Sequence, residues 1–302
     1  MGLPIVIEIL RGGLVESRHL GNAAVCDPAG AVVAEWGDSD RPTFPRSAIK
    51  PIQALPLVES GAADAFALTD EELALATASH SGEPMHTERV ARWLARIGLG
   101  PEALECGAGD RASPLHNNCS GKHAGFLTVA RHLGIRSAGY IRHDHPVQQM
   151  VSAAIAEATG TAGAPWGTDG CGIPTFSLPL SGIARAMAGM TTDRPAAARI
   201  VAAMRAHPHL VAGTNRLCTR FMQAVPGIVV KGGAEGVYGA IVPKKGWGVA
   251  LKIEDGAGRA AEAAILAVLA KLKLVSEERA SQLTPEIRNA AGKIVGEVRV
   301  TV

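Results

Sequence analysis

Runs of β-branched and apolar residues gather near the two ends of the chain, while its middle carries apolar residues at helical spacing. The runs are bounded by Gly, Pro and Asp and predict strands over residues 5–10, 23–26, 31–36, 227–231, 237–242, 247–253 and 295–302. The three-to-four spacing predicts helices over residues 69–79, 85–97, 121–132, 146–159, 180–190, 196–206, 215–224 and 258–271.

The order of these segments indicates the fold class. Strands from both ends, joined through hairpins, favour one mainly antiparallel sheet, because an all-parallel sheet needs strand and helix to alternate throughout. The helical portion, about residues 50–225, would pack on this sheet and leave a groove at the junction. We therefore expect an α+β fold, an α/β sandwich, in a single domain over residues 1–302, which contain no repeat or linker.

Composition excludes several function classes. The net charge is +2, no block of five like charges occurs and aromatic residues are only 4%, so we expect no nucleic-acid partner. An acidic residue at position 8 argues against a signal peptide, and no apolar run reaches membrane-spanning length, so we expect no membrane partner. Five cysteines, an odd number spread widely, favour a reducing cytoplasm over a disulfide framework.

Ser47 and Lys50 form an S-x-x-K element. In a helical turn these two positions share a face, so a neutral lysine can take the serine proton and create a nucleophile. Taken alone, the pattern also fits a helix-start serine and a solvated lysine. Pro45 and Pro51 bracket it, so we expect only a first helical turn at Ser47, with its hydroxyl at the positive end of a helix.

Two further polar segments are candidates for the same site. Residues 78–83, Ala-Ser-His-Ser-Gly-Glu, follow a predicted helix, and an ordinary helix cap with Gly82 in the left-handed conformation explains them about equally well. Lys231 ends a predicted strand before Gly232 and Gly233, which would let a ligand approach the backbone. The alternative for Lys231 is a surface lysine before a hairpin.

Asparagine, cysteine and lysine gather among glycines in residues 117–125, and residues 169–172 read Asp-Gly-Cys-Gly. Such turn-rich segments are typical of a reactive cleft and not of a packing face. Cys119, Lys122 and Cys171 could bind zinc, since thiolates and a deprotonated amine are possible ligands. The spacing is not a standard zinc signature, so a disulfide and two unconnected buried thiols stay open. Cys26, Cys106 and Cys218 are interpreted as packing residues.

As an ensemble in this order, the segments resemble the L-asparaginase II family, the class related to inducible rhizobial asparaginase. The matching segments span nearly the whole chain and comprise residues 11–13, 15–17, 19, 45–51, 78–83, 106–107, 118–123, 169–172, 207–208, 211–213 and 231–236. One departure is the stretch of nine residues between Gly107 and Asn117: the His-x-Pro that often follows the Cys-Gly in relatives is missing, and relatives usually carry a longer insert there.

The resemblance implies a fold similar to the serine β-lactamases and glutaminases, and hydrolysis of L-asparagine to L-aspartate and ammonia by a homodimer. It implies the site residues as well: catalytic Ser47, Lys50, Ser79 and Lys231; substrate-binding Arg46, His123, Asp169 and Gly170; and zinc ligands Cys119, Lys122 and Cys171. The alternatives are a glutaminase or broader amidase of the same fold, and a non-catalytic, zinc-stabilised amino-acid sensor.

Overall fold

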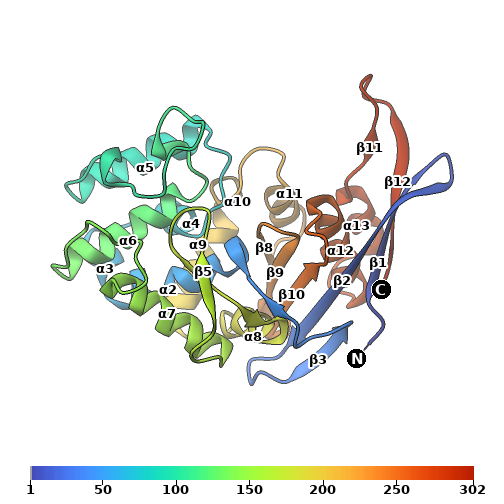
Figure 1. The fold of residues 1–302 in the computed structure, drawn as a ribbon, viewed down its shortest axis with the longest axis horizontal. Helices are drawn as coiled ribbons and strands as arrows, with labels where there is room; N and C mark the ends of the chain where they lie inside the picture. Colours follow the sequence, from blue (N-terminus) through green and yellow to red (C-terminus); the bar gives the residue numbers. More distant parts are fainter. Residues whose placement is uncertain (1) are drawn as a thin grey trace.

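The computed structural model describes residues 2–302 and contains one eight-stranded antiparallel sheet (Figure 1). Its strands run in the order β11-β12-β1-β2-β10-β9-β8, with β3 paired to β2. The strands of this sheet are β1 (Ile5–Arg11), β2 (Leu14–Cys26), β3 (Val32–Trp36), β8 (Val229–Gly232), β9 (Val237–Val242), β10 (Trp247–Ile253), β11 (Ile287–Arg288) and β12 (Ile294–Thr301). The first and last parts of the chain therefore meet, since β1 pairs with both β2 and β12.

Helices cover both faces of the central strands. The helix α8 (Leu180–Gly189) packs on one face so closely that a Cβ at Gly248 of β10 would lie 2.1 Å from the Ala184 carbonyl oxygen. On the other face, Tyr238 of β9 reaches Glu262 of α12 (Gly258–Lys271). Strands covered on both faces cannot alternate apolar with polar positions. Accordingly, all six residues of β9 are buried.

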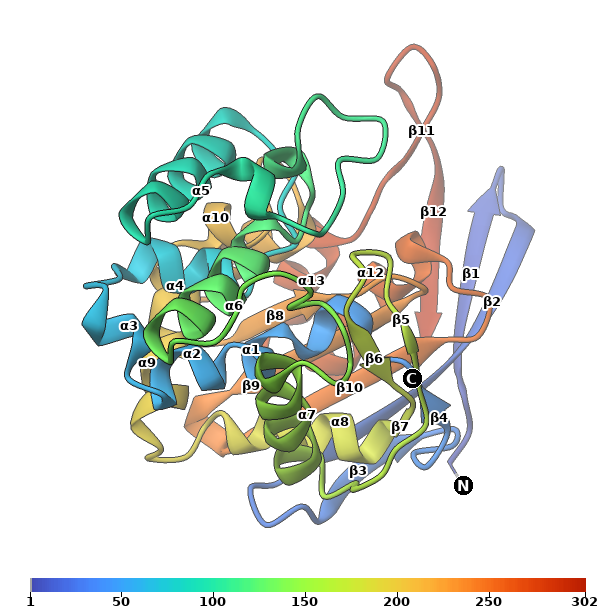
Figure 2. The ribbon, with the colours of Figure 1, turned by 60° about the vertical axis from the view of Figure 1, so that its left-hand side comes forward.

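The middle of the chain forms a helical layer beside the sheet (Figure 2). Its elements are η1 (Arg46–Ile49), α1 (Lys50–Gln53), α2 (Leu55–Glu59), α3 (Ala62–Ala65), α4 (Asp70–Ala76), α5 (Pro84–Arg96), η2 (Pro101–Ala103), η3 (Pro114–His116), α6 (Ser120–His132), α7 (Pro146–Thr159), α9 (Pro195–Ala206), α10 (Pro208–Val211) and α11 (Leu217–Ala224). Two small sheets, β4–β7 (Pro42–Thr43 with Leu178–Pro179) and β5–β6 (Trp166–Thr168 with Pro174–Phe176), lie in the same part of the chain. Near the C-terminus, η4 (Pro243–Lys245) and α13 (Glu277–Leu283) complete the fold.

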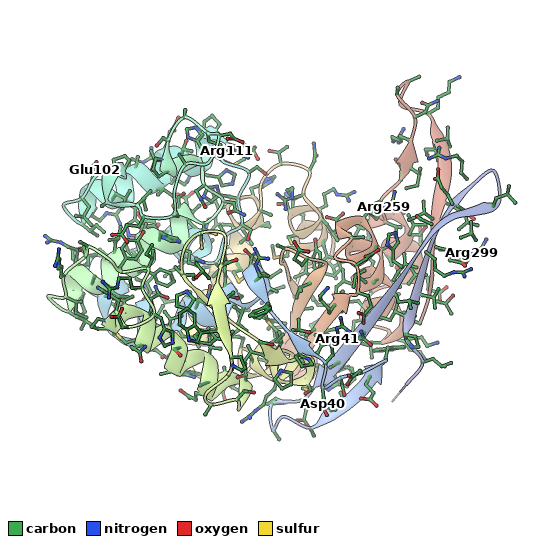
Figure 3. All side chains as sticks on the ribbon, viewed as in Figure 1. Asp40, Arg41, Glu102, Arg111, Arg259 and Arg299 are labelled. Carbon is green, nitrogen blue, oxygen red and sulfur yellow. The ribbon has the colours of Figure 1, made fainter. Side chains whose placement is uncertain are left out.

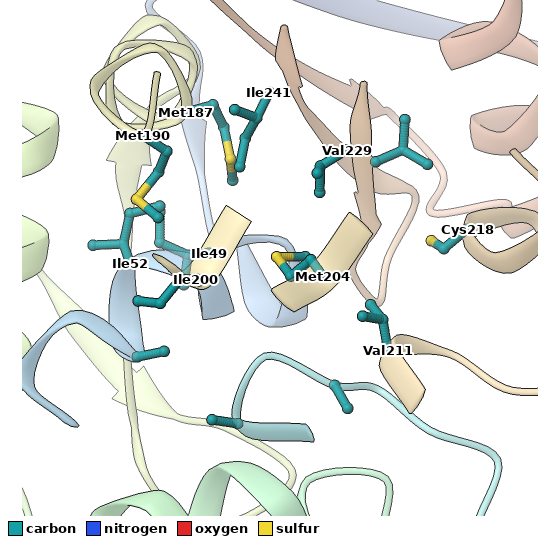
Figure 4. Close-up of a cluster of buried hydrophobic side chains, with 14 of the residues drawn as sticks. Ile49, Ile52, Met187, Met190, Ile200, Met204, Val211, Cys218, Val229 and Ile241 are labelled. Carbon is teal, nitrogen blue, oxygen red and sulfur yellow. The ribbon is translucent and has the colours of Figure 1, made fainter. Parts of the chain in front are cut away.

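A shared apolar core joins the helical layer to the sheet. In Figure 4, Ile200 and Met204 of α9 lie close to Ile49, and Val229 and Ile241 of the sheet face the same cluster. Burying one side chain of this size stabilises a fold by about 1.5–3 kcal/mol. Many charged side chains lie outside this core, as Glu102, Arg111 and Arg299 do in Figure 3, whereas Lys50 and Lys231 are buried. Among residues 2–302, no helix has the length and apolar character that a bilayer crossing requires.

The predicted α+β class, with an antiparallel sheet built from both chain ends and flanked by helices, is confirmed. A capping box begins the helix that follows Thr69: the Thr69 side chain accepts from the Glu72 amide, and the Glu72 carboxylate accepts from the Thr69 amide. Two boundaries were wrong. The strand β2 begins at Leu14 and not at residue 23, and the helix that follows Thr69 ends at Ala76, before residue 79.

Candidate active site

A cavity of about 400 Å³ opens where the helical layer meets the strand β8 at the edge of the sheet. Segments far apart in the sequence supply its walls. Predicted site residues that line it are Arg46, Ser47, Ser79, Cys119, Asp169, Gly170, Cys171 and Lys231. The structure therefore brings together the S-x-x-K serine, the strand-end lysine and the turn-rich cysteine segments.

Ser79 lies between two buried lysines. The Lys231 Nζ donates to Ser79 Oγ at 2.8 Å, and the Lys50 Nζ donates to the same oxygen at 3.0 Å. Lys50 also donates to the Ala78 carbonyl oxygen and, at 3.1 Å, to Cys119 Sγ. The exposed fractions are 0% for Lys50 and 2% for Lys231. Lysines are almost never fully buried unless partnered, so these contacts hold the two amines in fixed positions. Lys231 lines the cavity, whereas Lys50 does not.

Burial changes the protonation of both amines. Burial, followed by the nearby Lys50, lowers the pKa of Lys231 to about 7. Burial also lowers the pKa of Lys50, with Lys122 acting in the same direction. Desolvation disfavours the charged form of an amine. A substantial share of Lys231 is therefore neutral near pH 7 and can accept a proton.

Ser47 lies in the 3₁₀ helix η1, whose last residue leads directly into α1. This confirms the expected first helical turn, and Pro51 occupies the start of α1, where its missing N–H is tolerated. Gly233 follows β8 and packs on this turn: a Cβ there would lie 2.7 Å from the Pro45 carbonyl oxygen. Among residues 2–302, the Ser47 hydroxyl has no hydrogen-bond partner, and the three hydrogen bonds of Lys50 go elsewhere.

Cys119, Lys122 and Cys171 form a second buried group next to Lys50. The Lys122 Nζ donates to Cys171 Sγ at 3.2 Å, and none of the protein's five cysteines forms a disulfide. A hydrogen bond from Cys119 and, against the effect of burial, the charge of Lys122 lower the pKa of Cys171 to about 5. The same pairing and burial raise the pKa of Cys119 to about 12. The pair thus shares one proton, and one thiolate is present at neutral pH.

The sulfur donors of this group suit zinc, but Lys122 can bind a metal only as a neutral amine, and, although burial opposes the change, the charges of Cys171 and Cys119 raise its pKa. Two ligands of a tetrahedral zinc ion, one sulfur and one nitrogen, lie about 3.5 Å apart, close to the 3.2 Å between Lys122 Nζ and Cys171 Sγ. A thiolate is already present, and soft sulfur ligands suit zinc. Within residues 2–302, no group of three His, Cys, Asp or Glu side chains could hold a metal ion, so the lysine would have to be the third ligand.

Arg46 and Asp169 form an ion pair on another wall of the cavity. Arg46 adopts a φ of +49°, a left-handed conformation that costs a non-glycine residue about 1–3 kcal/mol. Its Nε donates to Asp169 Oδ1 at 2.6 Å, and the Gly170 amide donates to the same oxygen at 2.9 Å. Although burial opposes the change, Lys122 and Arg46 lower the pKa of Asp169. Asp169 is therefore a carboxylate on this wall of the cavity at neutral pH.

His123 is fully buried and does not line the cavity. Its Nδ1 lies 2.7 Å from the Tyr140 hydroxyl, and its Nε2 has no hydrogen-bond partner among residues 2–302. Burial and then Lys122 lower the pKa of His123 to about 3, so the ring is neutral. The substrate-binding role expected for His123 stays a prediction.

The segment after Ser79 is held by a histidine network. Gly82 has the expected left-handed conformation, with φ of +71°, but α4 has already ended at Ala76, so it does not cap that helix. His80 Nε2 lies 2.9 Å from Ser120 Oγ at the start of α6, and His80 Nδ1 accepts from the Gly82 amide. The short loop after Gly107 contacts the same segment, because Arg111 donates to the Ser81 carbonyl oxygen. These contacts fix the position of Ser79.

Sequence reasoning missed part of the cavity wall. The additional polar residues are Asn118, Arg216, Cys218, Tyr238 and Glu262. Cys218 was interpreted as a packing residue, yet it lines the cavity and accepts a hydrogen bond from the Gly232 amide. Asn118 belongs to the turn-rich segment and could have been found there, whereas the others carry no motif.

Comparison with known proteins gives one family match over almost the whole chain: the family described as L-asparaginase II matches residues 7–300. No curated protein matches the chain. Similar solved structures include a β-lactamase from Mycobacterium bovis, with 15% identity, a TM-score of 0.37 and coverage of 84% of this chain and 95% of that one. An octameric penicillin-binding protein homologue from Pyrococcus abyssi has 14% identity, a TM-score of 0.38 and coverage of 84% and 73%. Because these TM-scores are low, we base no conclusion on the two likenesses.

Proposed function

Since this chain belongs to the L-asparaginase II family, we propose that it hydrolyses L-asparagine to L-aspartate and ammonia through a serine acyl-enzyme. The observation that carries this proposal is the contact of two buried lysines with Ser79 in the same cavity as Ser47. Buried amines of lowered pKa can act as general bases near neutral pH.

We assign the nucleophile to Ser47 and a proton-relay role to Ser79. A hydroxyl has one donor hydrogen and two acceptor lone pairs. Ser79 Oγ lies within hydrogen-bond distance of both lysines, so the charged amine can donate to it while the neutral amine accepts its hydrogen, and one lone pair stays open to the Ser47 hydroxyl. The Ser47 oxygen has no partner within residues 2–302 and faces the cavity at the start of η1. This refines the expected direct transfer from Ser47 to Lys50, because the proton would pass through Ser79.

The reaction has two steps. The Ser47 oxygen attacks the side-chain amide carbon, and its proton passes through Ser79 to the neutral amine of the pair. The C–N bond then breaks as the departing nitrogen takes that proton from the amine and leaves as ammonia. Water then attacks the β-aspartyl ester with the same amine as base. Backbone N–H groups of the η1 turn would stabilise the oxyanion, and one such donor contributes about 2.7–4 kcal/mol.

Substrate recognition would use the Arg46–Asp169 wall. The Asp169 carboxylate would pair with the α-ammonium of a free amino acid, and Arg46 with its α-carboxylate. The ion pair between them, at 2.6 Å, holds both groups in place before binding. Gly170 leaves room beside them, since a Cβ there would meet only the end of Arg46, at 3.8 Å.

We further propose that Cys119, Lys122 and Cys171 hold zinc beside this wall. The ion would supply positive charge that fixes the three side chains and polarises nearby groups. Cys171 lies next to Gly170, so holding Cys171 also holds the substrate-binding loop between β5 and β6. The nucleophile in this account is a serine, and no metal-bound water is required.

An ammonia-release assay with L-asparagine and L-glutamine tests the proposal. We expect release from asparagine, and loss of release in Ser47→Ala with the circular dichroism spectrum unchanged. Ser281→Ala, an exposed serine on α13, is the matched control and should retain full activity. Full activity in Ser47→Ala would reject Ser47 as the nucleophile. Ammonia release from glutamine but not from asparagine would reject asparagine as the substrate.

A further inference from the structure

The cavity is larger than free asparagine requires. A cavity of about 150 Å³ holds the six carbons of benzene, so the nine non-hydrogen atoms of asparagine fill roughly 225 Å³ by the same scale. The cavity measures about 400 Å³. Roughly 175 Å³ is therefore left, enough for about seven more atoms.

The additional space has its own polar lining, supplied by elements other than those that carry Arg46 and Asp169. Arg216 precedes α11, Tyr238 lies on β9, and Glu262 lies on α12. In Figure 1, α11, β9 and α12 lie on the sheet side of the molecule, away from α6. Tyr238 donates to Glu262 Oε1 at 3.4 Å, and the Gly232 amide donates to Cys218 Sγ, which ties α11 to β8.

Arg216 is the cation of this second wall. Asn215, just before it, has φ of +60°, so a tight left-handed turn sets the direction of the chain at this point. Among residues 2–302, the Arg216 side chain has neither a hydrogen bond nor an ion pair. A guanidinium presents a fork of donors that matches a carboxylate. The charge of Arg216 acts on the nearby Glu262 carboxylate without bonding to it, so the donors of the guanidinium stay available to an anionic group on a ligand.

We propose that the cavity accepts asparagine whose side-chain nitrogen carries a second amino acid, that is a β-aspartyl dipeptide, with the carboxylate of the second residue bound by Arg216. This inference rests on the proposed function, because the same serines and lysines act. A β-aspartyl dipeptide with a small second residue, such as β-aspartylalanine, adds only five non-hydrogen atoms to asparagine. It fits the space that is left.

The chemistry follows that of the simple amide. The Ser47 oxygen bonds to the β-carbonyl carbon, the C–N bond to the second residue breaks, and the proton taken from Ser47 is delivered to the departing nitrogen. Water then cleaves the ester. One water is consumed, aspartate and a free amino acid are formed, and no oxidant or reductant is needed.

The test compares three substrates: asparagine, β-aspartylalanine and β-aspartyl methylamide, whose leaving group has no carboxylate. Free aspartate is measured for the wild type, for Arg216→Gln and for Arg205→Gln, which removes an exposed arginine outside the cavity. We expect the wild type to cleave β-aspartylalanine. In Arg216→Gln, kcat/KM for β-aspartylalanine should fall at least tenfold relative to the methylamide, and in Arg205→Gln this ratio should not change.

The outcomes separate this inference from the proposed function. Cleavage of asparagine without cleavage of β-aspartylalanine, or an unchanged ratio in Arg216→Gln, overturns the inference alone. If the dipeptide is cleaved and asparagine is not, asparagine is rejected as the substrate and the binding of a second residue at the Arg216 wall is supported. If no substrate is cleaved, the proposed function fails. The role of Arg216 is then decided by measuring β-aspartylalanine binding by calorimetry. Binding at least tenfold weaker in Arg216→Gln than in the wild type supports the inference, and equal binding overturns it.

Discussion

Lys231 and Ser79 lie 152 residues apart in the sequence and share a hydrogen bond of 2.8 Å. The lysine comes from the edge strand β8 and the serine from the segment after α4, so this bond joins the sheet to the helical layer at the cavity floor. Lys50 completes the arrangement from the start of α1. The site therefore exists only in the folded chain, and its parts can be tested one at a time.

Replacing Lys231 with methionine should lower kcat for asparagine by about 10²–10⁴, the usual contribution of a positioned general base. Methionine fills a similar volume, and removing a buried amine of lowered pKa is not expected to reduce the stability. Steady-state kinetics and urea unfolding measure the two effects. Lys244→Met, at an exposed position in η4, is the control and should change neither. A Lys231→Met enzyme with wild-type kcat would contradict the role of this amine.

The activity should depend on pH through the same lysine. Burial lowers the pKa of Lys231 to about 7, and only the neutral amine accepts a proton. As pH falls below about 7 the amine becomes charged, so kcat/KM should decrease toward acid and level off above neutral pH. Measuring kcat/KM from about pH 5 to about pH 9, which is roughly two pH units on either side of this pKa, checks the prediction. A profile that is flat through neutral pH in the wild type would show that Lys231 is not the base.

Gly233→Ala should damage both the stability and the activity. The new Cβ would lie 2.7 Å from the Pro45 carbonyl oxygen and 3.1 Å from the Ala48 amide, and these backbone atoms cannot move without moving the turn of Ser47. Overpacking of this kind costs about 1–3 kcal/mol. Gly189→Ala is the control, because nothing lies within 4 Å of a Cβ at this position at the end of α8. This substitution should raise the free energy of unfolding by up to about 1 kcal/mol. Equal urea midpoints for the two variants would refute the close packing.

Zinc binding should depend on the thiol pair. Protein prepared with zinc supplied should contain about one ion per chain by elemental analysis, and Cys171→Ser should contain almost none, since a hydroxyl is a far weaker zinc ligand than a thiolate. Cys26→Ser is the control because Cys26 is buried elsewhere and bonds the Ser181 carbonyl oxygen. Wild-type protein free of zinc, or full zinc content in Cys171→Ser, would contradict the assignment.

Much of the fold could be predicted because strands such as β9 are apolar on both faces. Val237–Val242 is buried throughout, so its apolar run was visible without knowledge of its neighbours. The first half of β2 was missed for the opposite reason. Residues such as Glu16 and Arg18 face solvent in a long hairpin, and their polar pattern resembles that of a loop.

The site was only partly predictable. The sequence indicated that Ser47, Lys50, Ser79 and Lys231 belong together, yet it could not say which hydroxyl each amine contacts. That choice depends on where α4 ends: because it ends at Ala76, Ser79 is carried in a non-helical segment against both lysines. Arg216 and Glu262 were missed because their contribution comes from packing α11 and α12 beside β8 and β9, which no local motif reports.

The most direct test of the central claim is to locate the acyl group. The enzyme is mixed with asparagine, quenched in acid during turnover, digested and analysed by mass spectrometry. The account predicts an aspartyl ester on the peptide that contains Ser47, absent from Ser47→Ala and accumulated in variants that slow ester hydrolysis. An ester on the peptide that contains Ser79, or full turnover without any ester on Ser47, would contradict it.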